Sequence, residues 1–398
     1  MTYIKPKKIF LLFLFIFTSS LLSISAECVS STVFNYTIDF PEMFKITDYS
    51  QDERSLLFEH SLLPVHAVIR VWQKDTYKDS EDALKTTLGK ISAQGQVTQV
   101  KWRNQKCAVT QLEISEASLG QKMSGWGVCI PLPESKDYLT VLSYAPQDKA
   151  YDCEQFILSL LDSIMIDRGS YTSEGIITAF AFPKKGGKKI ELNIAGKTIN
   201  TTIDLDDEEA NQFVVDREFA VFKLFVNQKC WKEAWQRFYR LIAKDGISRV
   251  KKASFDISNE LYEECKKNDP ALPEAALAQK LLTWTQTFSY ERPSSTADKA
   301  DFTNIIATLQ GKGSDCDSRS MLLMLLYKNL GLDSILLISL DYSHAMNGLY
   351  LEGKQGQTYT LDGKKYLFGE TTAKDLTFGM IAQDMQDRTK WIPVELYE

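Results

Sequence analysis

Residues 316–331 begin with a cysteine and continue as a helical pattern that is apolar on every side. Residues 321–326 read Met-Leu-Leu-Met-Leu-Leu, and Gly331 supplies a natural end for the helix. A helix without a polar face has to be buried. We therefore expect the chain to fold around this helix, with Cys316 in its first turn, directly after a glycine-containing loop.

Composition and length limit the other possibilities. The 398 residues are 44% hydrophobic and 25% charged, which is typical of a globular protein and excludes disordered or low-complexity chains. At about 100–200 residues per domain, the length indicates two or three domains. The sequence contains only three histidines. We therefore expect no metal site, no cofactor and no mechanism that needs several imidazoles.

Residues 1–26 have the pattern of a secretory signal peptide. Lys5, Lys7 and Lys8 precede an apolar run at 9–17, and small residues follow up to Ala26. This run is shorter than the roughly 20 apolar residues that span a bilayer, although a retained N-terminal anchor stays an alternative. We expect a secreted or periplasmic protein that meets a membrane only through this segment, if it is uncleaved.

The charge balance argues against two classes of partner. Removal of the signal segment would take away three lysines and no acid, changing the net charge from -6 to -9. An acidic protein is a poor match for nucleic acid or an anionic membrane. A protein or peptide substrate is the expected partner, and the oligomeric state stays open.

The seven cysteines divide into six before residue 270 and one, Cys316, after it. Disulfides persist outside the cytosol, so export favours structural bridges plus one reactive thiol. Cys107 and Cys129 lie on two strand-like runs, and Cys230 and Cys265 on two helix-like runs, which makes these pairings plausible. The alternative is that all seven are free, buried thiols.

Residues 27–168 are predicted to form an N-terminal α/β sandwich. Strand-like runs occur near residues 34–39, 67–72, 107–114 and 139–144, and helices are expected at 80–93, capped by Ser80, and at 152–165. His60 and His66 are interpreted as surface or packing residues. With its strand-rich middle and terminal helix, this segment resembles the PsbP-like fold of photosystem extrinsic proteins.

Residues 169–270 are predicted to form a β-hairpin followed by helices. The acidic run 204–209 is interpreted as the N-terminus of a helix reaching about residue 225, where the helix dipole favours carboxylates. A calcium site is the alternative, but the spacing of a calcium loop is missing. Trp231, Trp235 and Phe238 recur on one helical face, which indicates packing in a core or between domains.

Residues 271–398 bring chemically reactive groups into one segment. Cys316 heads the buried helix, His344 begins an apolar strand, and Glu370 ends a strand that follows a turn at 362–363. A helix N-terminus favours a thiolate and offers N–H groups to an oxyanion. Strand ends carry side chains to a common rim, where thiol, imidazole and carboxylate can align.

At this point the sequence resembles the transglutaminase-like superfamily. The resemblance covers about residues 272–375 and rests on Gly-Ser-Asp-Cys at 313–316, on His-Ala at 344–345 and on Gly-Lys-Lys-Tyr-Leu-Phe-Gly-Glu at 363–370. It implies a papain-like core, in which a buried helix headed by the nucleophilic cysteine packs on antiparallel strands.

The resemblance also implies residue roles. Cys316 would be the nucleophile, His344 the base and acid, and Glu370 the residue that orients the imidazole. The family usually has aspartate in the third role, so Asp362 is an alternative acid. The loop before the cysteine also departs from the family pattern, because Ser314 follows Gly313. Gln286 is a possible oxyanion donor.

The sequence thus predicts an α+β, multidomain protein with bodies at 27–168, 169–270 and 271–398 after the signal peptide at 1–26. Its expected function is thiol-dependent acyl transfer by an exported enzyme, as a cysteine peptidase or amidase that hydrolyses a peptide or amide bond. Two alternatives stay open. In the first, the domain at 271–398 is an inactive binding or assembly module, and in the second it is a transglutaminase that cross-links proteins.

Overall fold

The computed structural model describes residues 28–115, 120–293 and 299–397. The predicted signal peptide at 1–26 lies outside these ranges. None of the helices within them is long and apolar enough to cross a membrane. Helices and antiparallel sheets pack around more than one hydrophobic core, so the predicted α+β, multidomain class is confirmed.

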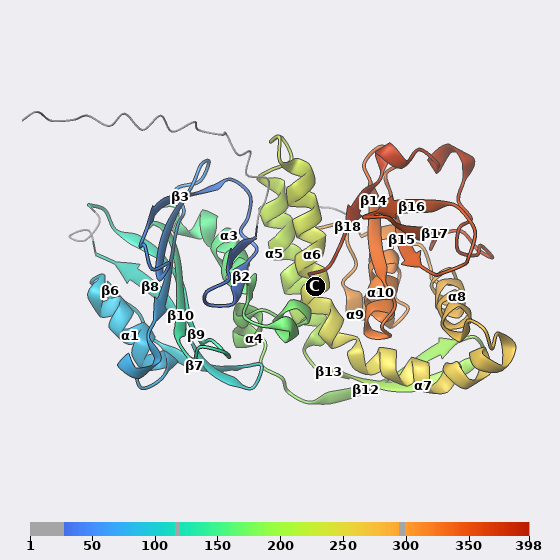
Figure 1. The fold of residues 1–398 in the computed structure, drawn as a ribbon, viewed down its shortest axis with the longest axis horizontal. Coiled ribbons are helices and arrows are strands. Elements are labelled where there is room, and N and C mark those ends of the chain that lie inside the picture. The colour runs from blue at the N-terminus through green and yellow to red at the C-terminus, as the bar shows by residue number, and fades with distance from the viewer. Residues whose placement is uncertain (1–27, 116–119, 294–298, 398) are drawn as a thin grey trace, which may run out of the picture.

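An eight-stranded antiparallel sheet forms the body of the N-terminal segment (Figure 1). Its hydrogen-bonded order is β3-β4-β5-β10-β9-β8-β6, and β7 also pairs with β8. The strands are β3 (Phe44–Tyr49), β4 (Ser55–His60), β5 (His66–Trp72), β6 (Ala93–Gln94), β7 (Thr98–Trp102), β8 (Gln105–Ile114), β9 (Met123–Pro131) and β10 (Tyr138–Pro146).

Helices cover both faces of this sheet. α3 (Ala150–Asp162) packs on one face and α1 (Ser80–Lys90) on the other, and alternate residues of each strand enter the two cores. Both helices were predicted, but the N-cap of α1 is Asp79 rather than Ser80, because the Asp79 side chain accepts the Asp82 N–H. Smaller elements complete this part: β1 (Val29–Ser31), β2 (Tyr36–Ile38), β11 (Ile164–Met165), η1 (Lys74–Thr76) and η2 (Arg168–Thr172).

Neither of the expected disulfides is present, and all seven cysteines are free thiols in the structure. Cys107 and Cys129 do lie on neighbouring strands, but Cys129 is paired with Ala108. This offset of one residue places the two thiols on opposite faces of the sheet, against α3 and α1 respectively. Cys230 precedes α6 (Trp231–Arg249) and packs against the N-terminal core, whereas Cys265 of α7 (Lys251–Asn268) is buried in the C-terminal core, so these two thiols lie in different cores.

The middle segment joins a hairpin to long helices. The acidic run lies at the start of α5, as predicted, and its carboxylates have local partners. Asp204 accepts the backbone N–H groups of Lys185 and Gly186, and Asp207 contacts Arg249 at 2.7 Å. The elements are α4 (Ile176–Ala181), β12 (Gly187–Ile194), β13 (Lys197–Asp204), α5 (Asp207–Lys223), α6 and α7.

α5 and α6 lie between the N-terminal and C-terminal sheets (Figure 1). Val221 of α5 and Ala234 of α6 belong to the N-terminal core, whereas Val214 and Phe238 belong to the C-terminal one. The predicted packing role is confirmed for Phe238 and Trp235 of α6, whereas Trp231 is partly buried and contacts the ring of Trp235. The C-terminal core extends from Ile190 in the hairpin to Leu396, so the expected boundary at residue 270 does not separate two cores.

A five-stranded antiparallel sheet, in the order β16-β17-β15-β14-β18, forms the C-terminal segment. α10 packs against β14 and β15, and residues 321–326 at its centre are fully buried, as predicted. The elements are α8 (Pro273–Thr285), α9 (Ile305–Leu309), α10 (Cys316–Asn329), β14 (Ser334–Ser339), β15 (His344–Tyr350), β16 (Thr358–Leu361), β17 (Lys364–Gly369), η3 (Gln383–Met385), η4 (Arg388–Lys390) and β18 (Ile392–Val394).

Buried charges cross the boundary between the N-terminal body and the helix pair. Arg217 of α5 contacts Asp162 at the end of α3 at 2.5 Å and its neighbour Glu218 at 2.7 Å. Arg237 of α6 contacts Glu218 at 3.1 Å and donates to the backbone carbonyl of Asp39 at 2.8 Å. None of these side chains is more than 3% exposed. Such charges are tolerated in a protein interior only when they are paired.

Two further bonds extend this network. Arg240 holds the Asp39 carboxylate at 2.9 Å, and Tyr397, near the C-terminal end of the chain, donates to the same carboxylate. Lys244 donates to the carbonyl of Asp162 at 3.2 Å. The network therefore ties the first strands, α3, α6 and the last residues together.

The first prediction concerns the thiols. When the unreduced protein is unfolded in denaturant and alkylated, we expect mass spectrometry to find a label on all seven cysteines. Prior reduction should leave the pattern unchanged. A disulfide-linked peptide containing Cys107 and Cys129 would contradict the register of β8 and β9.

The second prediction concerns the charge network. Replacement Arg237→Met leaves Glu218 buried without that partner, which should lower the free energy of unfolding by about 3–5 kcal/mol. Urea unfolding followed by circular dichroism measures the change. The matched control is Lys85→Met, which removes an exposed ion pair with Glu81 and should leave stability nearly unchanged. Equal losses in the two variants would contradict the role assigned to the network.

Candidate active site

Cys316 is the first residue of α10, and the loop before it is held against a second segment. Asp315 is the N-cap, and its carboxylate accepts the Ser318 hydroxyl at 2.6 Å. The backbone of Ser314 exchanges hydrogen bonds of 3.2 Å with Ser289 and Glu291. A Cβ on Gly313 would lie 2.2 Å from the Glu291 side chain, so this close approach requires glycine.

His344 and Glu370 meet because β15 and β17 are antiparallel neighbours. Asn347 pairs with Gly369, so the start of β15 lies beside the residue that follows β17. His344 Nε2 and Glu370 Oε2 are 2.8 Å apart. The other carboxylate oxygen, Oε1, accepts the Thr372 N–H at 2.7 Å and the Thr372 hydroxyl at 2.6 Å. The orientation of Glu370 is therefore fixed from both sides.

This hydrogen bond selects the tautomer of His344. An ionised Glu370 accepts a proton from Nε2, so Nδ1 carries the lone pair in the neutral ring. Nδ1 is then the nitrogen that can take a proton from a nucleophile. Trp391 packs edge-on against the imidazole, with 6.4 Å between ring centroids, and restricts the ring further.

The sulfur of Cys316 lies next to the first residues of β15. The backbone N–H of Ala345, the residue after His344, interacts with the sulfur, as does the N–H of Asp317. Ser320, one turn along α10, donates to the Ala345 carbonyl at 3.3 Å. Within the described residues these backbone groups, and not a direct thiol–imidazole hydrogen bond, link the helix start to the His344 strand.

The electrostatics around Cys316 differ from the expectation that its position favours the thiolate. Burial raises the pKa of Cys316 to about 12, the carboxylates of Asp317 and Asp315 add to the increase, and the N–H of Ala345 only partly offsets it. The side chain is 8% exposed. The resting group at neutral pH is therefore a thiol, because burial and two acids outweigh the helix N-terminus.

Asp317, the acidic residue that follows Cys316, contacts helix α6. Its carboxylate accepts the hydroxyl of Tyr239 from α6 at 2.8 Å. Burial, together with the nearby charge of Asp315, raises the pKa of Asp317 well above its usual range. Tyr239 was not identified from the sequence, because its partner is 78 residues away and no local motif marks the contact.

The pKa of Glu370 is shifted in the opposite direction to that of Asp317. Burial alone would raise the pKa of this carboxyl, but the hydrogen bond and charge of His344 and the bonds from Thr372 lower it below its usual value. Glu370 is therefore ionised at neutral pH. Its contribution to stability is present above the unfolded-state pKa and is lost as the pH falls through the lower folded-state pKa.

The structure separates the alternative acid, Asp362, from the imidazole. Asp362 is an exposed residue in the turn between β16 and β17. Glu370 lies beyond the other end of β17, a six-residue strand of roughly 20 Å. Glu370 and not Asp362 is therefore the carboxylate beside His344.

Gln286 lies near this site but has another contact. Its Nε2 donates to the carbonyl of Glu370 at 2.8 Å and to that of Leu376 at 3.1 Å. Both amide hydrogens are engaged, so Gln286 positions the backbone of Glu370 and offers no free donor to an oxyanion. Arg319 has a similar bracing role, since it donates to the carbonyls of Ser314 at 3.0 Å and of Thr371 at 3.3 Å.

The other two histidines lie in the N-terminal body. His60 is buried, its Nε2 is hydrogen-bonded to the Glu42 carbonyl at 2.8 Å, and its Nδ1 accepts backbone N–H groups. Burial lowers the pKa of His60 to about 4. His66 is half-buried and stacks on Tyr144. Both are packing residues. No group of three or more potential metal ligands was found among the described residues.

Comparisons with known proteins give no family. No family model matches the chain, and no curated protein matches it. A similar solved structure is the Ran-binding protein Mog1p of Saccharomyces cerevisiae, with 10% identity, a TM-score of 0.28 and coverage of 35% of this chain and 94% of that one.

Two other solved structures are similar at the same level. Cyanobacterial PsbP (CyanoP) from Synechocystis has 9% identity and a TM-score of 0.29 over 38% of this chain and 99% of that chain. A protein from Bacteroides thetaiotaomicron has 10% identity and a TM-score of 0.24 over 83% of this chain and 88% of that one. Similarities of this size assign no function to this chain.

The third prediction follows from the pKa of Cys316. Below a pKa of about 12, the thiolate fraction rises tenfold per pH unit. We expect the rate of iodoacetamide labelling at Cys316, followed by peptide mass spectrometry, to rise without a plateau between pH 6 and about pH 10. A cysteine peptide in solution, which levels off near its pKa of about 8.5, is the reference. A plateau below pH 8 would show a preformed thiolate and contradict the prediction.

Proposed function

We propose that the protein is an exported cysteine hydrolase that cleaves a peptide or amide bond and that residues 271–398 form a transglutaminase-like core. The observation that carries the proposal is the 2.8 Å hydrogen bond between His344 Nε2 and Glu370 Oε2, beside the helix start that bears Cys316. A thiol, an imidazole with a free Nδ1 and a carboxylate that orients the imidazole are the groups that thiol acyl transfer requires.

The reaction proceeds in two stages. In the first, the sulfur of Cys316 bonds to the carbonyl carbon and its proton passes to Nδ1 of His344. The imidazolium then gives this proton to the leaving amine as the C–N bond breaks, and the acyl group remains on the sulfur as a thioester. In the second, water attacks the thioester, His344 takes a proton from it, and the C–S bond breaks. His344 returns the proton to the sulfur.

The surroundings support this sequence of steps. Because the resting Cys316 is a thiol, His344 acts as a general base during the attack and not as the partner of a preformed ion pair. Glu370, whose pKa is lowered, stays ionised and stabilises the imidazolium. The partial positive charge of the helix N-terminus at the start of α10 would stabilise the oxyanion.

Export is supported by the basic and then apolar pattern of residues 1–26. The free thiols are compatible with an oxidising compartment, because Cys107 and Cys129 lie on opposite faces of a sheet and Cys230 and Cys265 belong to different cores. Six of the seven cysteines, all except Cys316, would then be structural packing residues.

One observation favours the alternative of an inactive binding module. The Cys316 side chain is 8% exposed and its pKa is about 12, which are the properties of a packed cysteine. A screen of peptide and amide substrates against the wild type and Cys316→Ala separates the two functions. Turnover that is lost in Cys316→Ala supports the hydrolase, and no turnover by either protein supports the binding module.

The fourth prediction assigns the roles within the site. With any substrate found, His344→Ala should lower kcat/KM by about 10²–10⁴-fold. Glu370→Gln should lower it by at least about tenfold, because the imidazole loses the charge that stabilises its protonated form.

The matched control is Asp362→Asn, the same change of acid to amide at the far end of β17, which should leave kcat/KM near the wild-type value. A larger loss in Asp362→Asn than in Glu370→Gln would reassign the third role. Added primary amine distinguishes hydrolysis from cross-linking, because a transglutaminase would incorporate the amine into the product and a hydrolase would release the free acid.

A further inference from the structure

A cavity of about 440 Å³ lies on the N-terminal sheet, beside α1 and far from Cys316 in the chain. α1 has only 11 residues, and Leu84 and Leu88 on its inner face pack over β8, β9 and β10. The part of the sheet formed by β4 and β5 extends beyond this cover. The cavity is the space left at the edge of the helix, and its volume is in the range that holds small ligands.

Two buried hydrogen-bond donors in the cavity wall have no acceptor. They are Nε of Arg70 and Nε1 of Trp72, and neither has a partner within the described part of the chain. Both residues belong to β5 and are two positions apart, so their side chains lie on the same face of the sheet. Buried donors of this kind are normally satisfied by protein, by water or by a ligand, so an acceptor is expected beside these two groups.

The charge of the cavity indicates an anion. The guanidinium of Arg70 lies 4.8 Å from the Trp72 ring, and Lys90 Nζ lies 4.1 Å from the same ring. Lys90 donates to the Tyr77 hydroxyl at 3.2 Å, and the charge of Arg70 contributes only a minor part of the lowering of the pKa of the exposed Asp52, which does not line the cavity. No Asp or Glu lines the cavity, although acidic residues outnumber basic ones in the chain by 52 to 46.

Most of the remaining wall is apolar, although Ser55, Thr87 and Ser92 also line it, and this wall selects the rest of the ligand. Val68, Ile114, Leu142 and the ring of Tyr144 line the cavity next to the two cations. A fully hydrated anion such as inorganic phosphate would leave these side chains without a partner. An apolar or aromatic group attached to the anion would contact them and be removed from water.

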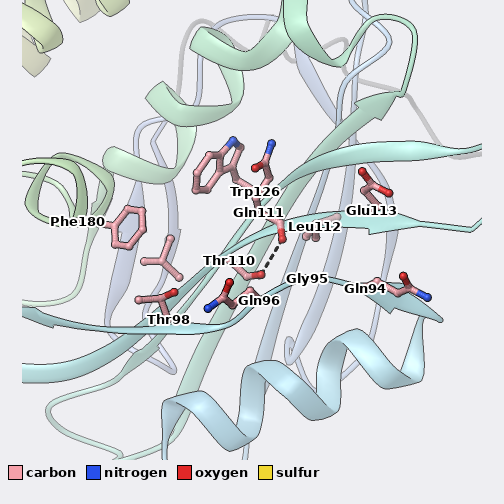
Figure 2. Close-up of a pocket in the computed structure, with 11 residues that line it drawn as sticks. Gln94, Gly95, Gln96, Thr98, Thr110, Gln111, Leu112, Glu113, Trp126 and Phe180 are labelled. Carbon is pink, nitrogen blue, oxygen red and sulfur yellow. Dashed lines mark hydrogen bonds between the residues drawn. The ribbon is translucent and has the colours of Figure 1, made fainter.

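A second cavity, of about 460 Å³, lies on the same N-terminal sheet, beside residues 94–98 and 109–113, and its lining is uncharged except for Glu113 (Figure 2). Gln94, Gln96 and Gln111 line it with Trp126 and Phe180, and their amides are exposed to water. It contains no cation and no buried donor without an acceptor among the residues shown, so its polar groups do not require a ligand.

We propose that the cavity beside α1 binds a small amphipathic carboxylate. The edge of the Arg70 guanidinium that carries Nε–H donates to the planar carboxylate, Trp72 Nε1 supplies a further donor, and Lys90 contributes charge. The apolar part of the ligand contacts Leu142 and Tyr144. The carboxylate belongs either to a free acid or to the C-terminus of a peptide, since both present the same group.

Calorimetric titration of the Cys316→Ala protein tests this proposal independently of the proposed hydrolase activity. The probes are 4-phenylbutyrate, its uncharged amide, inorganic phosphate, and the dipeptide acetyl-Leu-Phe with a free or amidated C-terminus. We expect the carboxylates to bind at least about tenfold more tightly than the matching amides and than phosphate. A preference for phenylbutyrate or for the dipeptide identifies the source of the carboxylate.

Variants locate the binding in the cavity. Arg70→Gln should weaken binding of the preferred carboxylate at least about tenfold, and Arg70→Lys, which keeps the charge but loses Nε–H, should weaken it to a smaller extent. Lys101→Gln, an exposed residue on β7 outside the cavity, is the control of equal charge change. Thermal unfolding of each variant checks that it is folded.

Three results would overturn the proposal. They are equal binding of acid and amide, unchanged binding in a folded Arg70→Gln protein, and no binding of any carboxylate at millimolar concentration. If neither Arg70 variant folds, the thermal shift of the protein with phenylbutyrate against that with its amide replaces the comparison of variants. A shift with the acid alone supports the carboxylate site, and equal shifts exclude it.

Discussion

The buried contact between Arg237 and Glu218 is the interaction on which the arrangement of the molecule depends. Each of these charges, taken out of water alone, would destabilise the fold by several kcal/mol, so the network is tolerated only when all its partners are in place. Arg237 also holds the carbonyl of Asp39, and Arg240 holds its carboxylate. The helix α6 therefore has one permitted position relative to the N-terminal sheet, whereas apolar packing alone would allow it to slide.

The same helix reaches the candidate active site from its other side. Tyr239, two residues after Arg237, donates to Asp317, which follows Cys316. Phe238 enters the core that also surrounds the fully buried helix α10. The start of α10 is thus positioned by a helix that is itself anchored in the N-terminal body. Contacts of α6 with both the N-terminal segment and the start of α10 fix the position of the candidate site. The N-terminal segment therefore contributes to the geometry of the site without supplying a reactive group.

Local patterns were sufficient to predict some features and not others. The apolar run at 321–326 predicts a buried helix, because a helix without a polar face has to be buried. The sequence also places His344 and Glu370 at strand ends, and the antiparallel pairing of β15 with β17 brings these two ends together. The pairing of Cys107 with Cys129 failed because strand register, which a sequence does not show, differs by one residue. The contact of Tyr239 with Asp317 was also missed, because it depends on the tertiary position of α6, which local sequence patterns do not show.

The state of the thiol illustrates how burial and reactivity compete. A helix that is apolar on every side must be buried, and this burial extends to its first residue, where it raises the pKa of Cys316 more strongly than any other influence. A helix N-terminus contributes only about half an elementary charge, and Asp315 and Asp317 oppose it with carboxylates. The site therefore cannot rely on a stable thiolate. If it is catalytic, the reactivity has to arise when His344, held in the required tautomer by Glu370, removes the proton as the new bond forms.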